Sequence, residues 1–328
     1  MSANPSNFNK SKISAAVADL IYVRPGPGLK RIITLSLCNL ILMTLTFAVR
    51  DNFWLFIPLC IVNGVVYSAA MTTSHDAIHR TLTGWWFFDE AAPRLFSYPI
   101  FWPHGIYAEL HKLHHKMNGR DLRDPERPTF TQEEYEQAGL LKRFTMRHHI
   151  FLSLFVYGGI GMVLKHVYQC IKLWKDFPQL KRAALIDLVG ISFCVSGILV
   201  LVVAMNIFWQ FVLYFLIMER VIGFLHQLRS IVEHYGLWIS SEWHLESKLK
   251  NCRNVKTNLF MRHLYNGLNS HSVHHAFPAV PFYNLELAHA RLKKLEKIPG
   301  DFLLEEKSYF RTTFRFMRQP LWLQTQKV

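Results

Sequence analysis

The sequence predicts an all-α integral membrane protein, in which four transmembrane helices form two hairpins and a cytoplasmic helical region caps them. Two features of the 328-residue chain predict this fold class: long apolar runs that occur in pairs, and an unusual composition. The chain is 51% hydrophobic, yet it carries 37 Lys and Arg against 23 Asp and Glu, for a net charge of +14. A soluble domain does not normally combine such hydrophobicity with such a charge.

The first hairpin is predicted within residues 31–72. Two largely apolar runs, 32–49 and 53–71, are each long enough to cross a hydrocarbon core of about 30 Å. Only Arg50, Asp51 and Asn52 separate them. We therefore expect two helices joined by a tight turn.

The second hairpin is predicted within residues 183–225. The apolar stretch 183–218 is too long for one span of roughly 20 residues. Asp187 is its only charged residue, and Asn206 lies past its middle. We expect helices at 183–205 and 207–225.

Three further segments flank the hairpins: an N-terminal segment (1–30), a middle region (73–182) and a C-terminal region (226–328). Arg50 is the only basic residue at the two hairpin tips. Because cytoplasmic loops carry the excess of Lys and Arg, all three segments are expected in the cytoplasm or its organellar equivalent.

Within the middle region, residues 150–164 are apolar and contain Gly158, Gly159 and Gly161. The segment is short for a span and long for a loop. If it crossed the membrane once, the C-terminal region would face the opposite side from the start of the middle region. We therefore predict an interfacial or re-entrant element.

Histidines form three clusters at helical spacing, one HxxxH and two HxxHH. Residues three and four positions apart share a helix face, so each cluster aligns its rings. A tetrahedral zinc site needs only four ligands, so eight imidazoles favour two metal ions side by side. A zinc metalloprotease is disfavoured because the first cluster lacks the Glu of HExxH. The predicted ligands are His75, His79, His111, His114, His115, His271, His274 and His275.

The order of these clusters, with apolar hairpins between them, resembles the membrane fatty acid desaturase superfamily of diiron enzymes. The third cluster continues as HSVHHAFPAVPFYNL (271–285), which is similar to the FPxVPxYxL tail of bacterial-type acyl desaturases. Residues 229–234 resemble the RxxxEH element of the family, which implies His234 as a ninth ligand. Ser230 departs from the Asn that several members have four residues before that histidine, which puts a solvent-mediated ligand there in doubt.

The resemblance implies an oxygen-dependent desaturase of lipid acyl chains, in acyl-lipid or acyl-thioester form, with two iron ions as cofactor. Without a Gly-rich dinucleotide motif, the chain is expected to need a ferredoxin-like or other external electron donor. The positive charge suits such a donor or anionic lipid, and nucleic acid is not an expected partner. A carotenoid or alkyl hydroxylase or ketolase of the same superfamily is the alternative. A membrane metal transporter, from a different class, would need ligands near the bilayer midplane.

Carboxylates beside the clusters are expected to orient the rings by accepting the outer ring N–H. Asp124 and Glu233 are the preferred candidates, ahead of Asp76 and Asp121. Asn269 is expected to cap the helix of the third cluster, with a ring-orienting role as the weaker interpretation. His226 is a possible liner of the site. Surface or interfacial positions are expected for His104, His148, His149, His166, His244, His263 and His289.

Overall fold

The computed structural model describes residues 10–238, 244–295 and 302–323, and most of them are helical. One short parallel pair, β1 (Asn254–Val255) and β2 (Glu305–Glu306), is the exception to the predicted all-α class. The main core lies where α11 meets the C-terminal helices. The helices are α1 (Lys10–Ala15), η2 (Ala18–Leu20), α2 (Pro25–Ala48), α3 (Phe53–Ile78), α4 (Trp86–Ser97), η3 (Tyr98–Ile100), α5 (His104–Met117), α6 (Gln132–Glu136), α7 (Leu140–Arg147), α8 (His149–Phe151), η4 (Leu152–Tyr157), α9 (Gly158–Leu173), α10 (Gln179–Ala204), α11 (Phe208–His234), α12 (His244–Lys250), α13 (Leu259–Leu264), α14 (His271–Ala276), η5 (Phe282–Asn284), α15 (Leu285–Lys293) and α16 (Tyr309–Arg318).

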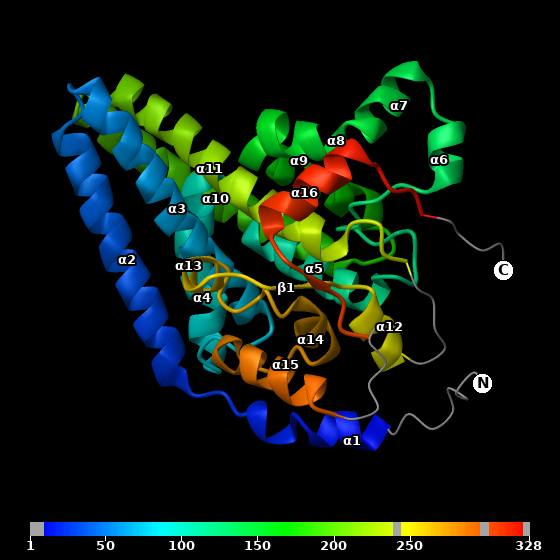
Figure 1. The fold of residues 1–328 in the computed structure, drawn as a ribbon. Coiled ribbons are helices and arrows are strands. Elements are labelled where there is room, and N and C mark those ends of the chain that lie inside the picture. The colour runs from blue at the N-terminus through cyan, green and yellow to red at the C-terminus, as the bar shows by residue number, and fades with distance from the viewer. Residues whose placement is uncertain (1–9, 239–243, 296–301, 324–328) are drawn as a thin grey trace, which may run out of the picture.

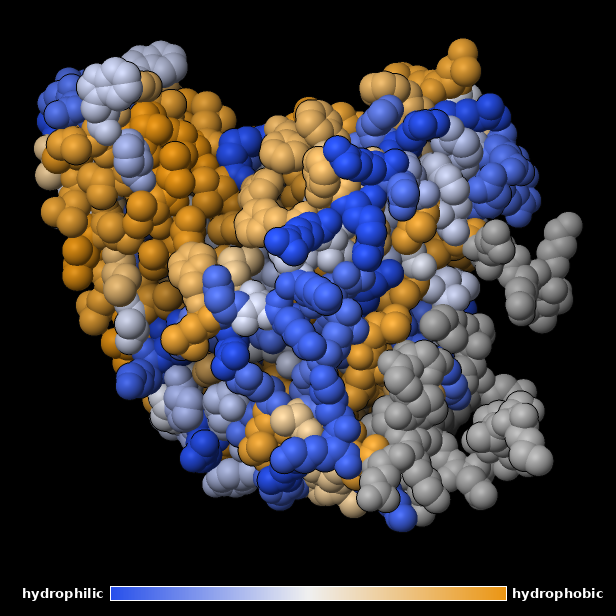
Figure 2. Space-filling view, viewed as in Figure 1, coloured by the Kyte–Doolittle hydropathy of each residue, from blue (hydrophilic) through white to orange (hydrophobic). Residues whose placement is uncertain are grey.

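Five helical segments among the described residues are long and apolar enough to cross a membrane. Four of them are α2, α3, α10 and α11, which form the two expected hairpins (Figure 1). Hydrophobic side chains gather over the end of the molecule where α2 and α3 lie, whereas hydrophilic ones cover much of the opposite part (Figure 2). The fifth segment is His149–Leu173, so the expected number of four spans is not confirmed.

This fifth segment is not one regular helix. A π-helical stretch, η4, ends at Gly158, whose φ of 54° lies in the left-handed region. The Glu219 carboxylate on α11 accepts the N–H groups of Gly159 and Ile160, at 3.0 and 3.2 Å. On the other side of the break, Arg220 donates to the carbonyl of Tyr157 at 3.0 Å. The adjacent charges in α11 therefore satisfy the backbone groups that the break releases.

The regular part after the break, α9, has 16 residues. At 1.5 Å per residue it extends about 24 Å, which is less than the hydrocarbon core of about 30 Å. An interfacial or re-entrant position for this segment stays a prediction.

Two of these long apolar helices extend beyond their expected ends and carry histidines there. α3 continues to Ile78, so His75 lies in its last turn, and α11 continues to His234. Gly236, with a φ of 73°, follows directly and supplies the left-handed conformation common after helix ends. The first cluster and His234 thus lie at the ends of membrane-type helices, not in separate loops.

Asp187, the only charged residue in the apolar stretch 183–218, holds the start of α5. Pro103 occupies the N-cap position there and supplies no side-chain cap. The carboxylate of Asp187 instead accepts the N–H groups of Gly105 and Ile106 at 3.0 and 2.7 Å, and the Tyr98 hydroxyl at 2.9 Å. A Cβ at residue 105 would lie 3.0 Å from this carboxylate, so glycine permits the close approach.

The short helix α14 is fixed by the segment around β1. The side chain of Asn254 accepts the N–H of Ser272 at 3.2 Å and donates to its hydroxyl oxygen at 2.8 Å. The N-cap position of α14 is Ser270, so the prediction that Asn269 caps this helix is wrong. Asn269 lies one residue earlier, where its side-chain amide donates to the Val255 carbonyl.

We expect Asp187→Ala to destabilise the protein, because it leaves buried donors at the start of α5 without their acceptor. The loss should amount to about 1–3 kcal/mol in the free energy of unfolding. Thermal unfolding of the purified protein in nanodiscs measures it, with Asp51→Ala at the exposed hairpin tip as the control. Asp187→Asn, which retains one acceptor oxygen, should fall between the two. An Asp187→Ala protein as stable as the control would contradict the assigned role.

Candidate metal centre

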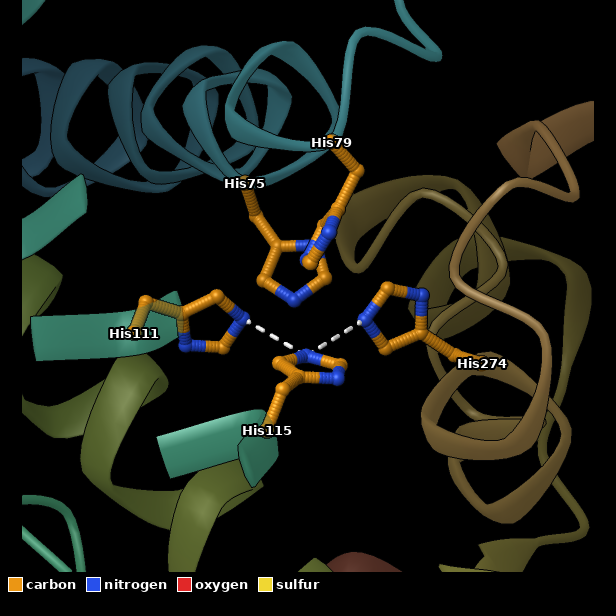
Figure 3. Close-up of side chains that lie close together, drawn as sticks. All are labelled: His75, His79, His111, His115 and His274. Atoms are coloured by element: carbon orange, nitrogen blue, oxygen red, sulfur yellow. Dashed lines mark hydrogen bonds between the residues drawn. The ribbon is translucent and has the colours of Figure 1, made fainter. Parts of the chain in front are cut away.

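Five histidines from three separate elements converge in one group. Each offers a ring nitrogen, and these atoms all lie within 4.8 Å of one another. Figure 3 shows the rings turned toward a common centre. The members are His75 on α3, His79 directly after it, His111 and His115 on α5, and His274 on α14.

A second group lies beside the first. It consists of His234 at the end of α11, Cys252 before β1, and His271 and His275 on α14, again with one possible ligand atom each within 4.8 Å. His114 adjoins this group, because its ring centroid lies 4.7 Å from that of His234 and 5.0 Å from that of His275. The structure thus brings all nine sequence-predicted ligands together and adds Cys252.

The two groups of histidines are in direct contact through one pair of rings. The rings of His115 and His275 stack with centroids 4.1 Å apart and an interplanar angle of 9°. His115 belongs to the first group and His275 to the second, so only stacked imidazoles separate the two positions. Two ions held there would be neighbours.

The inner nitrogens are arranged as metal ligands are. The Nε2 atoms of His111 and His115 lie 3.0 Å apart, those of His115 and His274 3.1 Å, and those of His234 and His271 2.8 Å. Two imidazole nitrogens bound at right angles to one ion, each at about 2.1 Å, would lie about 3 Å apart. Neutral rings that donate through Nδ1 present bare lone pairs at Nε2. Facing lone pairs repel unless a cation lies between them, so these residues fit a metal pair.

Carboxylates face the outer nitrogens of three of these rings. The distance from Nδ1 to the nearest carboxylate oxygen is 2.9 Å for His111 and Glu126, 2.9 Å for His114 and Asp124, and 3.3 Å for His271 and Glu233. Such partners fix the tautomer and the ring orientation of metal-ligating histidine. Asp124 and Glu233 therefore lie where they were expected. Glu126 was missed, although it lies only eleven residues after His115, at the end of the stretch HHKMNGRDLRDPE (114–126).

Glu233 is itself held by two neighbours. Arg229 donates to Oε2 at 2.9 Å, and the hydroxyl of Tyr309 on α16 donates to Oε1 at 3.1 Å. α16 therefore touches the site through a single tyrosine, 76 positions later in the chain. No sequence spacing could have indicated that contact.

The less favoured candidates for orienting the rings lie in different positions relative to the site. Asp76 Oδ1 lies 4.0 Å from His75 Nδ1, and the side-chain amide of Asn266 donates to Oδ2 of the same carboxylate. Asp121 pairs with exposed Arg123 instead. The Asn269 side chain donates to the Val255 carbonyl and, within the described residues, makes no hydrogen bond to a ligand ring.

The other histidines lie outside both groups. His226 is partly buried and lines a small cavity with His75, as a liner of the site would. His104 and His166 are buried, so the prediction of surface or interfacial positions is wrong for them. His148 and His263 are exposed, and His149 and His289 are half-buried. The side chain of His244 lies outside the described residues.

Burial keeps most of the site's imidazoles neutral. It lowers the pKa of His115, His274 and His275 well below the ordinary value. His114 behaves differently. Burial alone would lower its pKa, but the carboxylates of Asp124 and Glu126 outweigh burial and raise it.

We expect the metal-free protein to lose stability as the pH falls from 7.5 to about 5.5. In the unfolded chain these rings take up protons near pH 6.5, whereas folded His115, His274 and His275 do not, so acid favours unfolding. The raised pKa of His114 opposes this effect, but it is one ring against several whose pKa is lowered. Thermal unfolding with a chelator measures the slope, which His275→Asn should flatten and exposed His263→Asn should leave unchanged. A melting temperature that is constant or rises on acidification would contradict it.

Comparison with known proteins identifies the family to which this chain is similar. The family model described as fatty acid desaturase matches residues 52–301. The chain is 24% identical to the sn-1 oleoyl-lipid 12-desaturase of Arthrospira platensis, over 77% of this chain and 72% of the relative. It is 22% identical to the sn-1 acyl-lipid omega-3 desaturase (ferredoxin) of Nostoc sp. (strain 36), over 88% and 85%. It is 27% identical to the dihydrorhizobitoxine desaturase of Bradyrhizobium elkanii, over 72% and 67%.

The family match spans most of the chain and includes all three histidine clusters and His234. The expected resemblance is thereby confirmed. The chain belongs to the fatty acid desaturase family and is an oxidoreductase.

Proposed function

We propose that this protein is an oxygen-dependent desaturase of lipid acyl chains that works with two iron ions held by the nine histidines. The adjoining groups of inward-facing imidazoles carry the proposal. His75, His79, His111, His115 and His274 would hold one ion, and His114, His234, His271 and His275 the other. When bound, the pair would supply the redox change with dioxygen that removal of hydrogen from an unactivated methylene needs.

The protein's own groups prepare this site by holding protons in place. Glu126 and Asp124 accept from the outer Nδ1 atoms of His111 and His114, and a Glu233 oxygen lies 3.3 Å from Nδ1 of His271. The Nε2 lone pairs of these three rings can therefore face inward. The site lies at the ends of α3 and α11 and is closed by α5 and α14. Burial of the rings excludes bulk water from the reacting position.

An apolar cavity supports a lipid substrate. It measures about 210 Å³ and lies between α9, α11 and the segment after α4. Leu164, Phe215 and Ile222 are among its lining residues, and Trp102 closes one side. The same tryptophan lines the small cavity that contains His75. We infer that an acyl chain enters from the bilayer side and passes Trp102 toward the first group.

The distribution of charge supports a proposal for the electron donor and for the sidedness. We propose that the three flanking segments lie on the cytoplasmic side, because Arg50 is the only basic residue at the hairpin tips. A ferredoxin-like acidic donor suits that basic face, and the name of the Nostoc relative specifies ferredoxin. The name of the Bradyrhizobium relative specifies dihydrorhizobitoxine, so the assay should extend beyond lipids.

Production of the chain in a host of known lipid content, with a ferredoxin system, should generate new double bonds in the lipid acyl chains. Mass spectrometry of fatty acids, carotenoids and other metabolites detects the products. His111→Ala and His274→Ala should abolish them, because each removes a proposed ligand, whereas His263→Ala at an exposed position should not.

The products, the metal content and a transport assay discriminate between the candidate functions. New hydroxyl or keto groups would replace desaturation by the hydroxylase or ketolase alternative. Metal analysis of the purified protein should find about two iron ions per chain, in keeping with a dimetal site. One zinc ion without iron would contradict both the desaturase and the hydroxylase or ketolase. Metal uptake across vesicles without oxidation products would indicate a transporter.

Filling the apolar cavity should alter chain selection. Val163 on α9 lines it, and Val163→Trp should reduce the conversion of long chains severalfold more than that of short ones. Val167→Trp, one turn later at an exposed position outside the cavity, is the matched control. Product distributions from a mixture of chain lengths measure the effect. An equal reduction for all lengths would argue against this route.

A further inference from the structure

Cys252 is a buried thiol that touches the second group from outside. It has no exposed surface, and its Sγ lies 3.7 Å from Nδ1 of His234. The side-chain amide of Asn118, at the end of α5, donates to the same sulfur at 3.3 Å. The sulfur is therefore in a position to accept from two sides.

The position of this sulfur matches that of a carboxylate in the other rings. His111, His114 and His271 each have a carboxylate at Nδ1, at 2.9, 2.9 and 3.3 Å. His234 has the thiol at Nδ1, while its Nε2 faces Nε2 of His271 at 2.8 Å. A metal ion between those two Nε2 atoms would lie on the opposite side of the His234 ring from Cys252.

We propose that Cys252 is the positioning residue of His234. Its sulfur accepts the Nδ1–H, which fixes the tautomer that turns the Nε2 lone pair toward the second ion, and the sulfur is not itself a ligand. A neutral thiol is a weaker acceptor than a carboxylate, so it pulls less on the Nδ1 proton and leaves His234 a weaker ligand than the other three rings. The second ion would be held by four rings, of which His234 is the weak one, whereas five rings would hold the first. We therefore expect the second ion to be bound less tightly.

The loop after α5 packs against the segment that carries Cys252 and fixes the position of the thiol. Gly119 has a φ of 71°, and a Cβ there would lie 2.0 Å from the side-chain nitrogen of Asn251. Residues 118 and 119 thus pack directly against residues 251 and 252. The end of the helix that carries His111, His114 and His115 is consequently tied to the partner of His234.

Titration of the chelated full chain in nanodiscs with Co²⁺ tests the proposal. Wild-type protein should bind two ions with unequal affinity. Cys252→Ala should weaken only the second ion, by the roughly 10–100-fold typical of lost orienting partners. Cys252→Ser should restore most of that affinity, because its hydroxyl can accept the same proton. Cys170→Ala, at a buried thiol that donates to the Leu180 carbonyl away from the site, is the control.

The absorption spectrum of the cobalt-loaded protein shows whether Cys252 is a hydrogen-bond partner of His234 or a ligand of the metal. We expect no sulfur-to-cobalt charge-transfer band in the wild-type protein; such a band, absent from Cys252→Ser, would overturn the proposal. Unchanged binding by Cys252→Ala, or an equal loss in the Ala and Ser variants, would overturn it as well. The inference rests on the proposed metal pair, whose own failure would be distinct, because the wild-type chain would then not bind two ions.

Discussion

The rest of the structure depends on the direction in which the imidazole rings point. A histidine can serve a metal only if one nitrogen presents a lone pair, and the proton on the other nitrogen needs an acceptor. Glu126 and Asp124 supply that acceptor for His111 and His114, and Glu233 lies 3.3 Å from Nδ1 of His271. For these rings the outer nitrogen is fixed, so only one orientation turns the inner lone pair toward the site, and α5 must be placed accordingly.

Membrane-type helices contribute more than anchoring to this arrangement. α3 and α11 deliver His75 and His234 at their ends, and α10 holds the start of α5 through Asp187. A buried carboxylate in an apolar helix is costly unless its oxygens are bonded. Here three donors satisfy Asp187, so the charge that interrupts an otherwise apolar stretch has a structural reason.

The spacing of residues in the sequence predicted the features that depend on nearby residues. The helical periods of the three clusters aligned their rings, and the lengths of the apolar runs marked both hairpins. Contacts between distant segments could not be predicted in this way. Glu126 lies 15 positions from His111, Asn266 lies 190 positions from Asp76, and Cys252 has no neighbour in a recognisable pattern. Asn269 shows the limit of local reasoning, because the helix begins one residue later than its capping preference suggested.

The break at Gly158 has a consequence for the order in which the chain is assembled in a membrane. Its released backbone groups are bonded by Glu219 and Arg220, about 60 residues later in the chain. Unbonded N–H and C=O groups are not stable in hydrocarbon. During synthesis the segment 149–173 emerges before those partners exist. If the segment is re-entrant, as predicted, it would reach its final depth only after α11 has been inserted, and the proposed ligand His234 arrives on that same helix.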